Sequence, residues 1–178
     1  VKMPALAKSM GLPKFLGNHL RDVQTHSVPQ APLHPDANNL PLIVFSHGLG
    51  GMKTQNSIQA EELASRGYVV IAADHAYDAF LTLLDDGTTA DYRSRGQGIT
   101  TEDEFWAARG PQLATRAADV TFMLDVIASA QRDTAKNGSE SAQQIASSNP
   151  LWRVVDLSRI GVFGHSFGGA SLLKYLEA

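Results

Sequence analysis

The sequence predicts an α/β fold built on a doubly wound, mostly parallel sheet. Three short apolar runs lead to this prediction, and each of them stops at small or polar residues. Their hydrophobicity is continuous rather than alternating, which is typical of strands covered on both faces. Helical patterns lie between the runs, so the order of elements predicts right-handed βαβ crossovers. The predicted strands are Leu40–Ser46, Tyr68–Ala73 and Arg159–Gly164.

Three helices are predicted from hydrophobic spacing. The first covers residues 54–66 and stops before Gly67, and the last runs from Phe167 to the end of the chain. The middle helix, residues 112–130, has the clearest pattern, because its apolar residues recur every three or four positions and form one stripe. That stripe consists of Leu113, Ala117, Val120, Leu124 and Ile127. The apolar side of the last helix is expected to hold Leu172, Leu173 and Leu176.

Two segments show no regular pattern. Residues 76–104 mix Gly, Thr and Asp, and we expect a long irregular excursion beyond the end of a strand. Residues 134–149 are polar, and we expect a surface loop or a weak helix. The chain therefore divides into an N-terminal arm, residues 1–39, and an α/β core, residues 40–178.

The N-terminal arm contains a candidate helix at residues 6–20. Its apolar residues would form one face with basic residues nearby, as in helices that lie on a lipid surface. A helix packed on the sheet would show the same pattern, so both interpretations stay open. The apolar residues are Met10, Leu12, Phe15, Leu16 and Leu20, and the basic residues are Lys8, Lys14 and Arg21.

The composition is that of an ordinary globular protein with a hydrophobic core. Of the 178 residues, 43% are hydrophobic, and 15 basic and 18 acidic side chains give a formal net charge of -3. This balance argues against a nucleic-acid partner. The chain has no cysteine, which excludes disulfides and thiolate metal sites, and its histidines lack metal-ligand spacing. No apolar run is as long as the ~20 residues that are needed to span a bilayer. We therefore expect a soluble chain that is either secreted or cytoplasmic. We also expect no cofactor.

The strongest chemical signal is Gly164-His165-Ser166-Phe167-Gly168, which fits the G-x-S-x-G nucleophile elbow. In this motif the serine lies on a tight, strained turn between a strand and a helix, so its hydroxyl projects above the sheet. Glycine is needed on each side because a Cβ there would come too close. The predicted strand before the motif and helix after it provide the required context. We therefore expect an α/β-hydrolase fold with Ser166 as the nucleophile; a turn that needs glycine for packing alone is the alternative.

A second glycine-rich turn, Ser46–Gly51, follows the first predicted strand. Acyl-transfer enzymes need backbone N–H donors aimed at the developing oxyanion. In this fold one donor follows the nucleophile directly and the other lies in a loop after an earlier strand. We therefore expect the N–H groups of Leu49 and Phe167 to form the oxyanion hole. The turn lacks the full G-x-G-x-x-G pattern, so a nucleotide-binding loop is the less favoured alternative.

Other residues at the strand ends are expected to have supporting roles. The residues that should brace the two turns are His47, Gly48, Gly164, His165 and Gly168. Asp74 and His75 end the second predicted strand, where adjacent side chains point to opposite faces. We expect this pair to make local hydrogen bonds at the floor of the cleft rather than to act directly as acid and base.

The triad acid and base are not found after the serine. In this fold the order along the chain is serine, acid, histidine. The twelve residues after Ser166 contain no histidine, and their one acid, Glu177, lies in the helix that follows the serine. A serine without a general base is a poor nucleophile. We therefore expect C-terminal strands of the same domain, carrying the acid and the histidine, to lie outside these residues.

Three stretches of the chain are similar to one known family. They are LPLIVFSHGLGG at 40–51, ASRGYVVIAADH at 64–75 and LSRIGVFGHSFGGAS at 157–171. All three resemble the platelet-activating factor acetylhydrolases of the plasma and type II intracellular kind, in which Phe also follows the serine. The resemblance implies a calcium-independent esterase that releases short or oxidised sn-2 acyl chains from phospholipids, with the nucleophile and oxyanion donors named above. The family has an arginine where this chain has Ala76.

Two other functions stay open. Related bacterial enzymes with this core hydrolyse simple carboxylic esters or polyesters, so a general carboxylesterase or polyester hydrolase is the first alternative. The second is a non-catalytic binding protein that kept the fold and lost its base. In the enzyme interpretations the partner is an ester or phospholipid substrate, met in solution or at a lipid surface.

Overall fold

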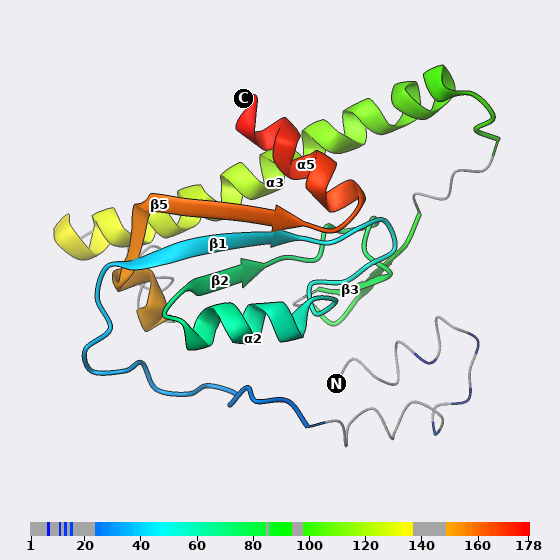
Figure 1. The fold of residues 1–178 in the computed structure, drawn as a ribbon. Helices are drawn as coiled ribbons and strands as arrows, with labels where there is room; N and C mark the ends of the chain where they lie inside the picture. The colour runs from blue at the N-terminus through cyan, green and yellow to red at the C-terminus, as the bar shows by residue number, and fades with distance from the viewer. Residues whose placement is uncertain are drawn as a thin grey trace.

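The computed structural model describes residues 24–84, 86–93, 98–136 and 149–178, together with residues 7, 11, 13 and 15. Figure 1 shows the arrangement of its helices and strands. The strands are β1 (Leu40–Ser46), β2 (Val69–Ala72), β3 (Leu81–Leu83), β4 (Thr89–Asp91) and β5 (Val155–Gly164). The helices are α2 (Ser57–Ser65), α3 (Glu102–Lys136) and α5 (Phe167–Leu176), with a 3-10 helix, η2, at Pro150–Arg153.

Three strands form a parallel sheet in the order β2-β1-β5. β1 lies in the middle, where its Ile43 pairs with Val70 of β2 and with Gly161 of β5. Leu42 and Val44 of β1 are fully buried, as expected for a central strand of a parallel sheet. The three predicted strands and the α/β fold class are confirmed.

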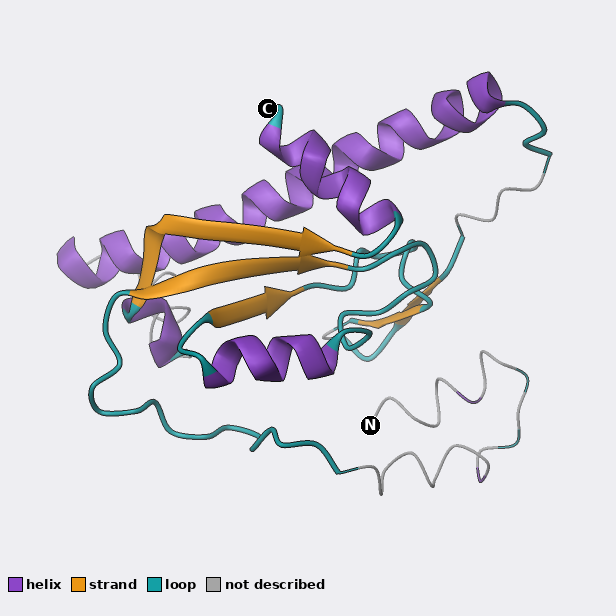
Figure 2. Ribbon diagram, in the orientation of Figure 1, coloured by secondary structure: helices purple, strands orange, loops and turns teal. Residues whose placement is uncertain are grey.

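Helices cover both faces of this sheet. α3 and α5 pack against each other on one side of the strands, and α2 lies beside β2 on the other side (Figures 1 and 2). The predicted stripe of α3 faces the sheet, because all five of its residues are buried. Three of the five, Val120, Leu124 and Ile127, join Leu42 and Val44 of β1 in one hydrophobic core.

The sheet places the two predicted catalytic turns at the same edge. Parallel strands end on the same side of a sheet, and binding sites of α/β proteins lie at these carboxyl ends. Ser46, the last residue of β1, pairs with Gly164, the last residue of β5. The glycine-rich turn after β1 and the turn after β5 therefore begin side by side.

The segment predicted to be an irregular excursion, residues 76–104, contains regular structure. β3 and β4 pair as an antiparallel hairpin, and α3 already begins at Glu102. A capping box fixes this start: Glu104 N–H donates to Thr101 Oγ1 (3.2 Å), and Thr101 N–H donates to the Glu104 carboxylate (3.0 Å). The prediction followed the apolar stripe, which begins at Leu113, and so it missed the polar first turns of the helix.

α5 differs from the prediction on one face. Leu172 is 2% exposed, but Leu173 and Leu176 are 65% and 64% exposed. Hydrophobic spacing alone does not tell which face of a helix meets the sheet, and in the described part of the chain no element covers Leu173 and Leu176. The predicted arm helix at residues 6–20 falls almost entirely outside the described residues. The same holds for most of the polar segment 134–149, of which α3 includes residues 134–136.

None of the described helices is both long enough and apolar enough to cross a bilayer.

Candidate active site

Ser166 lies in the turn between β5 and α5, with a backbone φ of 52° and ψ of -121°. A positive φ is uncommon for a residue with a Cβ, and it persists only where surrounding contacts hold it. This strained turn between a strand and a helix is the geometry of a nucleophile elbow. Ser166 is exposed, and its side chain does not cap α5. The hydroxyl is therefore available at the carboxyl edge of the sheet.

The two glycines of the motif are required by close backbone contacts. A Cβ on Gly164 would lie 2.5 Å from the Gly168 carbonyl carbon. A Cβ on Gly168 would lie 2.0 Å from the Ser46 carbonyl oxygen, which also accepts a hydrogen bond from the His165 N–H (3.1 Å). The elbow is thus pressed against the end of β1, and glycine at 168 makes that approach sterically allowed.

The first turn of α5 leaves one backbone donor open beside Ser166. Gly168 N–H donates to the His165 carbonyl (2.9 Å), and Gly169 N–H donates to the Ser166 carbonyl (2.9 Å). Within the described residues, Phe167 N–H donates to no backbone group. An unpaired N–H at a helix N-terminus, where the helix dipole is positive, favours a negatively charged oxygen.

The turn after β1 has a similar open donor. Gly51 N–H donates to the Gly48 carbonyl (3.0 Å), and Gly50 N–H donates to the Asp78 carbonyl (2.9 Å). In the part of the chain that the structure describes, Leu49 N–H has no backbone partner. The turn also touches the elbow, because a Cβ on Gly48 would lie 3.4 Å from the Cβ of Ser166. Two open donors therefore lie on the two turns that flank the serine.

His47 is buried and neutral in this turn. Burial lowers the pKa of His47 to about 4, against the opposing effect of the hydrogen bond to the Gly48 carbonyl. Its Nε2 accepts from the His75 N–H (3.1 Å), so in the neutral ring Nδ1 carries the proton and donates to the Gly48 carbonyl (2.7 Å). The bracing role of His47 stays a prediction. His165 is exposed and joins the turns through its backbone.

A hydrogen-bonded chain of serine, histidine and aspartate runs beneath the turn. Ser46 Oγ lies 3.0 Å from His75 Nε2, and His75 Nδ1 lies 2.7 Å from Asp119 Oδ2 on α3. Ser46 is fully buried and His75 is 3% exposed, whereas the Asp119 side chain is 45% exposed, so the serine and histidine of this chain are closed to a substrate. Asp74 instead accepts from the Lys53 N–H (2.7 Å). These contacts agree with the expected local bonding, but sequence reasoning missed Asp119.

Arg116 of α3 is a second residue that the sequence analysis missed. It is 1% exposed; its Nε donates to Asp78 Oδ2 (2.8 Å), and its Nη1 donates to the His47 carbonyl (2.7 Å). Its guanidinium also lies 5.0 Å from the centre of the Phe167 ring. Arg116 occupies the apolar stripe of α3, directly before Ala117, and a charged residue in a buried stripe is the signal that could have identified it.

The described residues provide no general base for Ser166. No hydrogen bond joins the Ser166 hydroxyl to a histidine within them, and His47 and His75 are engaged beneath the turn. The arrangement at the sheet edge can hold a nucleophile and an oxyanion.

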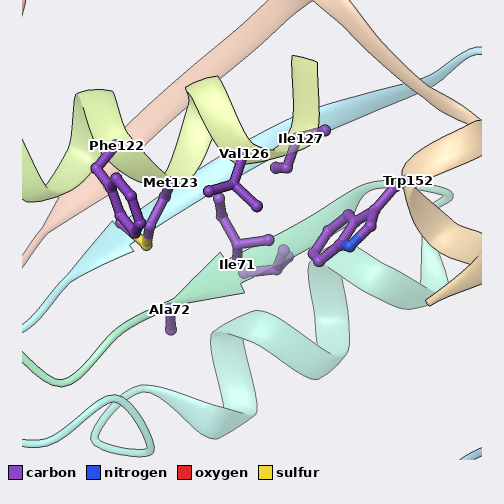
Figure 3. Close-up of a pocket in the computed structure, with 8 residues that line it drawn as sticks. Ile71, Ala72, Phe122, Met123, Val126, Ile127 and Trp152 are labelled. Carbon is purple, nitrogen blue, oxygen red and sulfur yellow. The ribbon is translucent and has the colours of Figure 1, made fainter. Parts of the chain in front are cut away.

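An apolar groove lies away from these turns, along the free edge of the sheet (Figure 3). It has a volume of about 400 Å³ and runs between α3, β2 and η2. Its lining residues are Val70, Ile71, Ala72, Phe122, Met123, Val126, Ile127 and Trp152. Because it contains none of the predicted site residues, the groove is not part of the candidate active site.

Comparison with known proteins identifies the family. Residues 4–178 match the family model described as "Platelet-activating factor acetylhydrolase, isoform II". The chain belongs to this family. Among its relatives, the platelet-activating factor acetylhydrolase of Canis lupus familiaris is 30% identical over 97% of the chain, which corresponds to 40% of that protein. The protein named "Probable 1-alkyl-2-acetylglycerophosphocholine esterase" of Arthroderma benhamiae is 25% identical over 82% of the chain and 30% of its own length.

A solved structure supports the fold assignment. The ferulic acid esterase of Streptomyces cinnamoneus matches with a TM-score of 0.67 and 29% identity, over 99% of the chain and 42% of its own. The chain therefore has the α/β-hydrolase fold predicted for it. It spans about 40% of the length of the acetylhydrolase of Canis lupus familiaris and of this esterase.

Proposed function

We propose that this chain carries the nucleophile and the oxyanion hole of a serine ester hydrolase that works through an acyl-enzyme. The observation that carries the proposal is the position of Ser166. It is an exposed serine with a positive φ, and it lies between two turns that each present an open N–H donor. Membership of an acetylhydrolase family supports the same chemistry.

In the proposed reaction Ser166 Oγ attacks the carbonyl carbon of the ester while a histidine removes its proton. The carbonyl oxygen becomes an oxyanion that accepts hydrogen bonds from the N–H groups of Leu49 and Phe167. Collapse of the tetrahedral intermediate breaks the ester bond, and the histidine returns the proton to the leaving alkoxide. Water then attacks the acyl-enzyme by the same route, which releases the acid and restores Ser166.

The acid and histidine of the triad are proposed to come from a further part of the same domain. The described residues place no histidine at Ser166, and relatives are more than twice as long as the chain, which covers 40% of one and 42% of another. The proposed substrate is a phospholipid with a short or oxidised sn-2 acyl group, met in solution or at a lipid surface. The names of the relatives support this substrate class.

A general carboxylesterase or polyester hydrolase is the second candidate. The specific observation in its favour is the likeness to an esterase named for ferulic acid, which is not a phospholipid ester. Rates on a short-chain phospholipid, p-nitrophenyl butyrate and a polyester film would separate the two candidates. An acetylhydrolase that acts on phospholipids should hydrolyse the short-chain phospholipid clearly faster than the other two substrates at equal concentrations of ester.

The test of the shared chemistry is labelling of the full-length protein with a fluorophosphonate. We expect a single adduct on Ser166, found by peptide mass spectrometry, and no adduct in Ser166→Ala. Ser171→Ala is the matched control, because Ser171 is fully buried and bonded to the Phe167 carbonyl, and it should leave the Ser166 adduct in place. A folded full-length protein without label on Ser166 would instead indicate a binding protein that has lost catalysis.

A further inference from the structure

We propose that Arg116 is a positioning residue that holds both oxyanion donors in place. This inference rests on the proposed function and adds a residue from α3 to it. The two donors lie on separate turns, one after β1 and one at the start of α5. Arg116 contacts both turns, although it touches no substrate.

The first contact fixes the turn that contains Leu49 at both of its ends. Arg116 Nη1 donates to the His47 carbonyl (2.7 Å), and Arg116 Nε donates to Asp78 Oδ2 (2.8 Å). The backbone carbonyl of Asp78 in turn accepts from the Gly50 N–H (2.9 Å). His47, two residues before Leu49, is therefore bound to Arg116, and Gly50, directly after Leu49, is bound to the backbone of Asp78, the partner of Arg116 in the ion pair. The Leu49 N–H lies between these two anchored positions.

The second contact reaches the other donor. The Arg116 guanidinium lies 5.0 Å from the centre of the Phe167 ring, within the range of a cation–π interaction. Phe167 is 7% exposed and is the first residue of α5, so packing of its ring fixes the direction of its backbone N–H. Through its rigid, planar guanidinium, Arg116 thereby holds the N–H groups of Phe167 and Leu49 in a fixed position relative to each other.

Arginine is suited to this task and lysine is not. The guanidinium presents N–H donors in a fixed fork and stacks on aromatic rings, whereas an ammonium group is a point charge on a flexible stem. A buried ion pair also contributes little net stability, because removing two charges from water offsets most of their attraction. A role in geometry therefore accounts for Arg116 better than a role in stability.

The other polar residue of α3 beneath the turn does not compete for this role. Asp119 binds His75, and His75 binds Ser46 and the His47 ring. Those contacts support the end of β1 and the His47 side chain. Neither Asp119 nor His75 contacts Phe167 in any interaction of the described residues, so only Arg116 reaches both turns.

The experiment compares Arg116→Gln and Arg116→Lys with wild type in the full-length protein, using p-nitrophenyl acetate. Fluorophosphonate titration first counts the active Ser166 sites in each preparation. We expect kcat per titrated site to fall about 100-fold in Arg116→Gln, since a misplacement near 1 Å can cost that much, and KM to stay within about threefold. Arg116→Lys should recover less than about a tenth of the loss, because it keeps the charge without the fork.

Arg132 provides the matched control, since it is an exposed residue of the same helix that bonds to Ser129 (2.9 Å), one turn away in α3. Arg132→Gln should leave kcat and KM unchanged. Inhibition by a trifluoromethyl ketone, which forms an oxyanion on the serine, should weaken in Arg116→Gln in parallel with the fall in kcat/KM. A purely structural role would instead reduce the number of titrated sites and leave kcat per site at the wild-type value, which would overturn the inference.

Asp78→Asn decides the question if neither Arg116 variant folds. It removes the charge that holds the guanidinium and keeps the backbone carbonyl that binds Gly50, so kcat per site should fall at least about tenfold. If kcat per site in Asp78→Asn stays within about threefold of the wild-type value, the inference about Arg116 is overturned. The proposed function would still stand in that case, provided that Ser166 of the wild-type protein is labelled. Absence of label on wild-type Ser166 would overturn both.

Discussion

At the scale of single residues, the backbone of Ser166 is held from outside the residue. Its positive φ of 52° would be unfavourable in isolation, and two contacts with the end of β1 compensate for it. The His165 N–H donates to the Ser46 carbonyl, and Gly168 packs directly on the same oxygen. The strain of the elbow is therefore a property of how β5 and β1 end together.

Gly168 gives the sharpest test of this close approach. In Gly168→Ala the new Cβ would lie 2.0 Å from the Ser46 carbonyl oxygen, which is backbone and has little room to move. We expect the free energy of unfolding to fall by more than about 3 kcal/mol, measured by urea denaturation. Gly169→Ala is the control, because its nearest neighbour would lie at 3.7 Å, and it should be neutral or stabilising by up to about 1 kcal/mol. If Gly168→Ala and Gly169→Ala changed the free energy of unfolding equally, the close approach of Gly168 to Ser46 would not be what requires glycine at 168.

His47 predicts a dependence of stability on pH. Burial lowers its folded-state pKa from 6.5 to about 4, so folding favours the neutral ring. Its contribution is complete above pH 6.5 and is lost as the pH falls toward 4. Between pH 7 and pH 5 we expect a loss of about 2 kcal/mol in the free energy of unfolding that His47→Asn does not show. The same loss in both proteins would mean that His47 is not the group responsible.

The sequence identifies the residues whose roles are local. Ser166 and its glycines, and the turn with Leu49, stand out because their spacing along the chain encodes the geometry. Arg116 could not be found this way, since its partners are 38 and 69 residues away in sequence. Such pairs depend on how α3 docks on the sheet, and this docking is a tertiary property.

At the scale of elements, α3 has two functions in the structure. Its apolar stripe forms the core with β1, while Arg116 binds the His47 carbonyl in the turn after β1 and Asp119 binds His75 after β2. The position of the helix on the sheet therefore also sets the position of these anchors. A shift of α3 would move both the core contacts and the turn after β1.

Leu124 tests the docking of α3. Leu124→Ala removes a side chain that is 9% exposed and belongs to the core, so we expect the free energy of unfolding to fall by about 3 kcal/mol. The neighbouring Asp125 is exposed, and Asp125→Ala should change stability by no more than about 0.5 kcal/mol. Thermal denaturation of the full-length protein measures both. A loss at Leu124 no larger than that at Asp125 would show that this stripe does not hold the helix.

The sequence predicts the long, periodic elements well and the short ones poorly. The stripe of α3 and the three strands of the parallel sheet match the structure because burial on one face or on both faces leaves a clear pattern. β3 and β4 have three residues each, too few to show a period, so they were predicted to be irregular. The capping box at Thr101 and Glu104 is a signal in the sequence for the start of α3.

At the scale of the whole molecule, the chain has an α/β-hydrolase fold that corresponds to part of the length of its relatives. It spans about 40% of the length of a curated relative and of a solved esterase. Within the described residues β5 pairs with β1 alone, so the strand that precedes Ser166 forms an edge of the sheet. The turn that holds Ser166 and the glycine-rich turn after β1 therefore lie together at this edge of the sheet.

The most direct measurement is a crystal structure of the full-length protein after reaction with a fluorophosphonate. The account predicts a covalent phosphonate on Ser166, with its P–O oxygen at about 2.7–3.1 Å from the backbone nitrogens of both Leu49 and Phe167. A phosphonate on another residue would contradict it. A phosphonate on Ser166 whose P–O oxygen contacts neither the Leu49 nor the Phe167 backbone nitrogen would also contradict it.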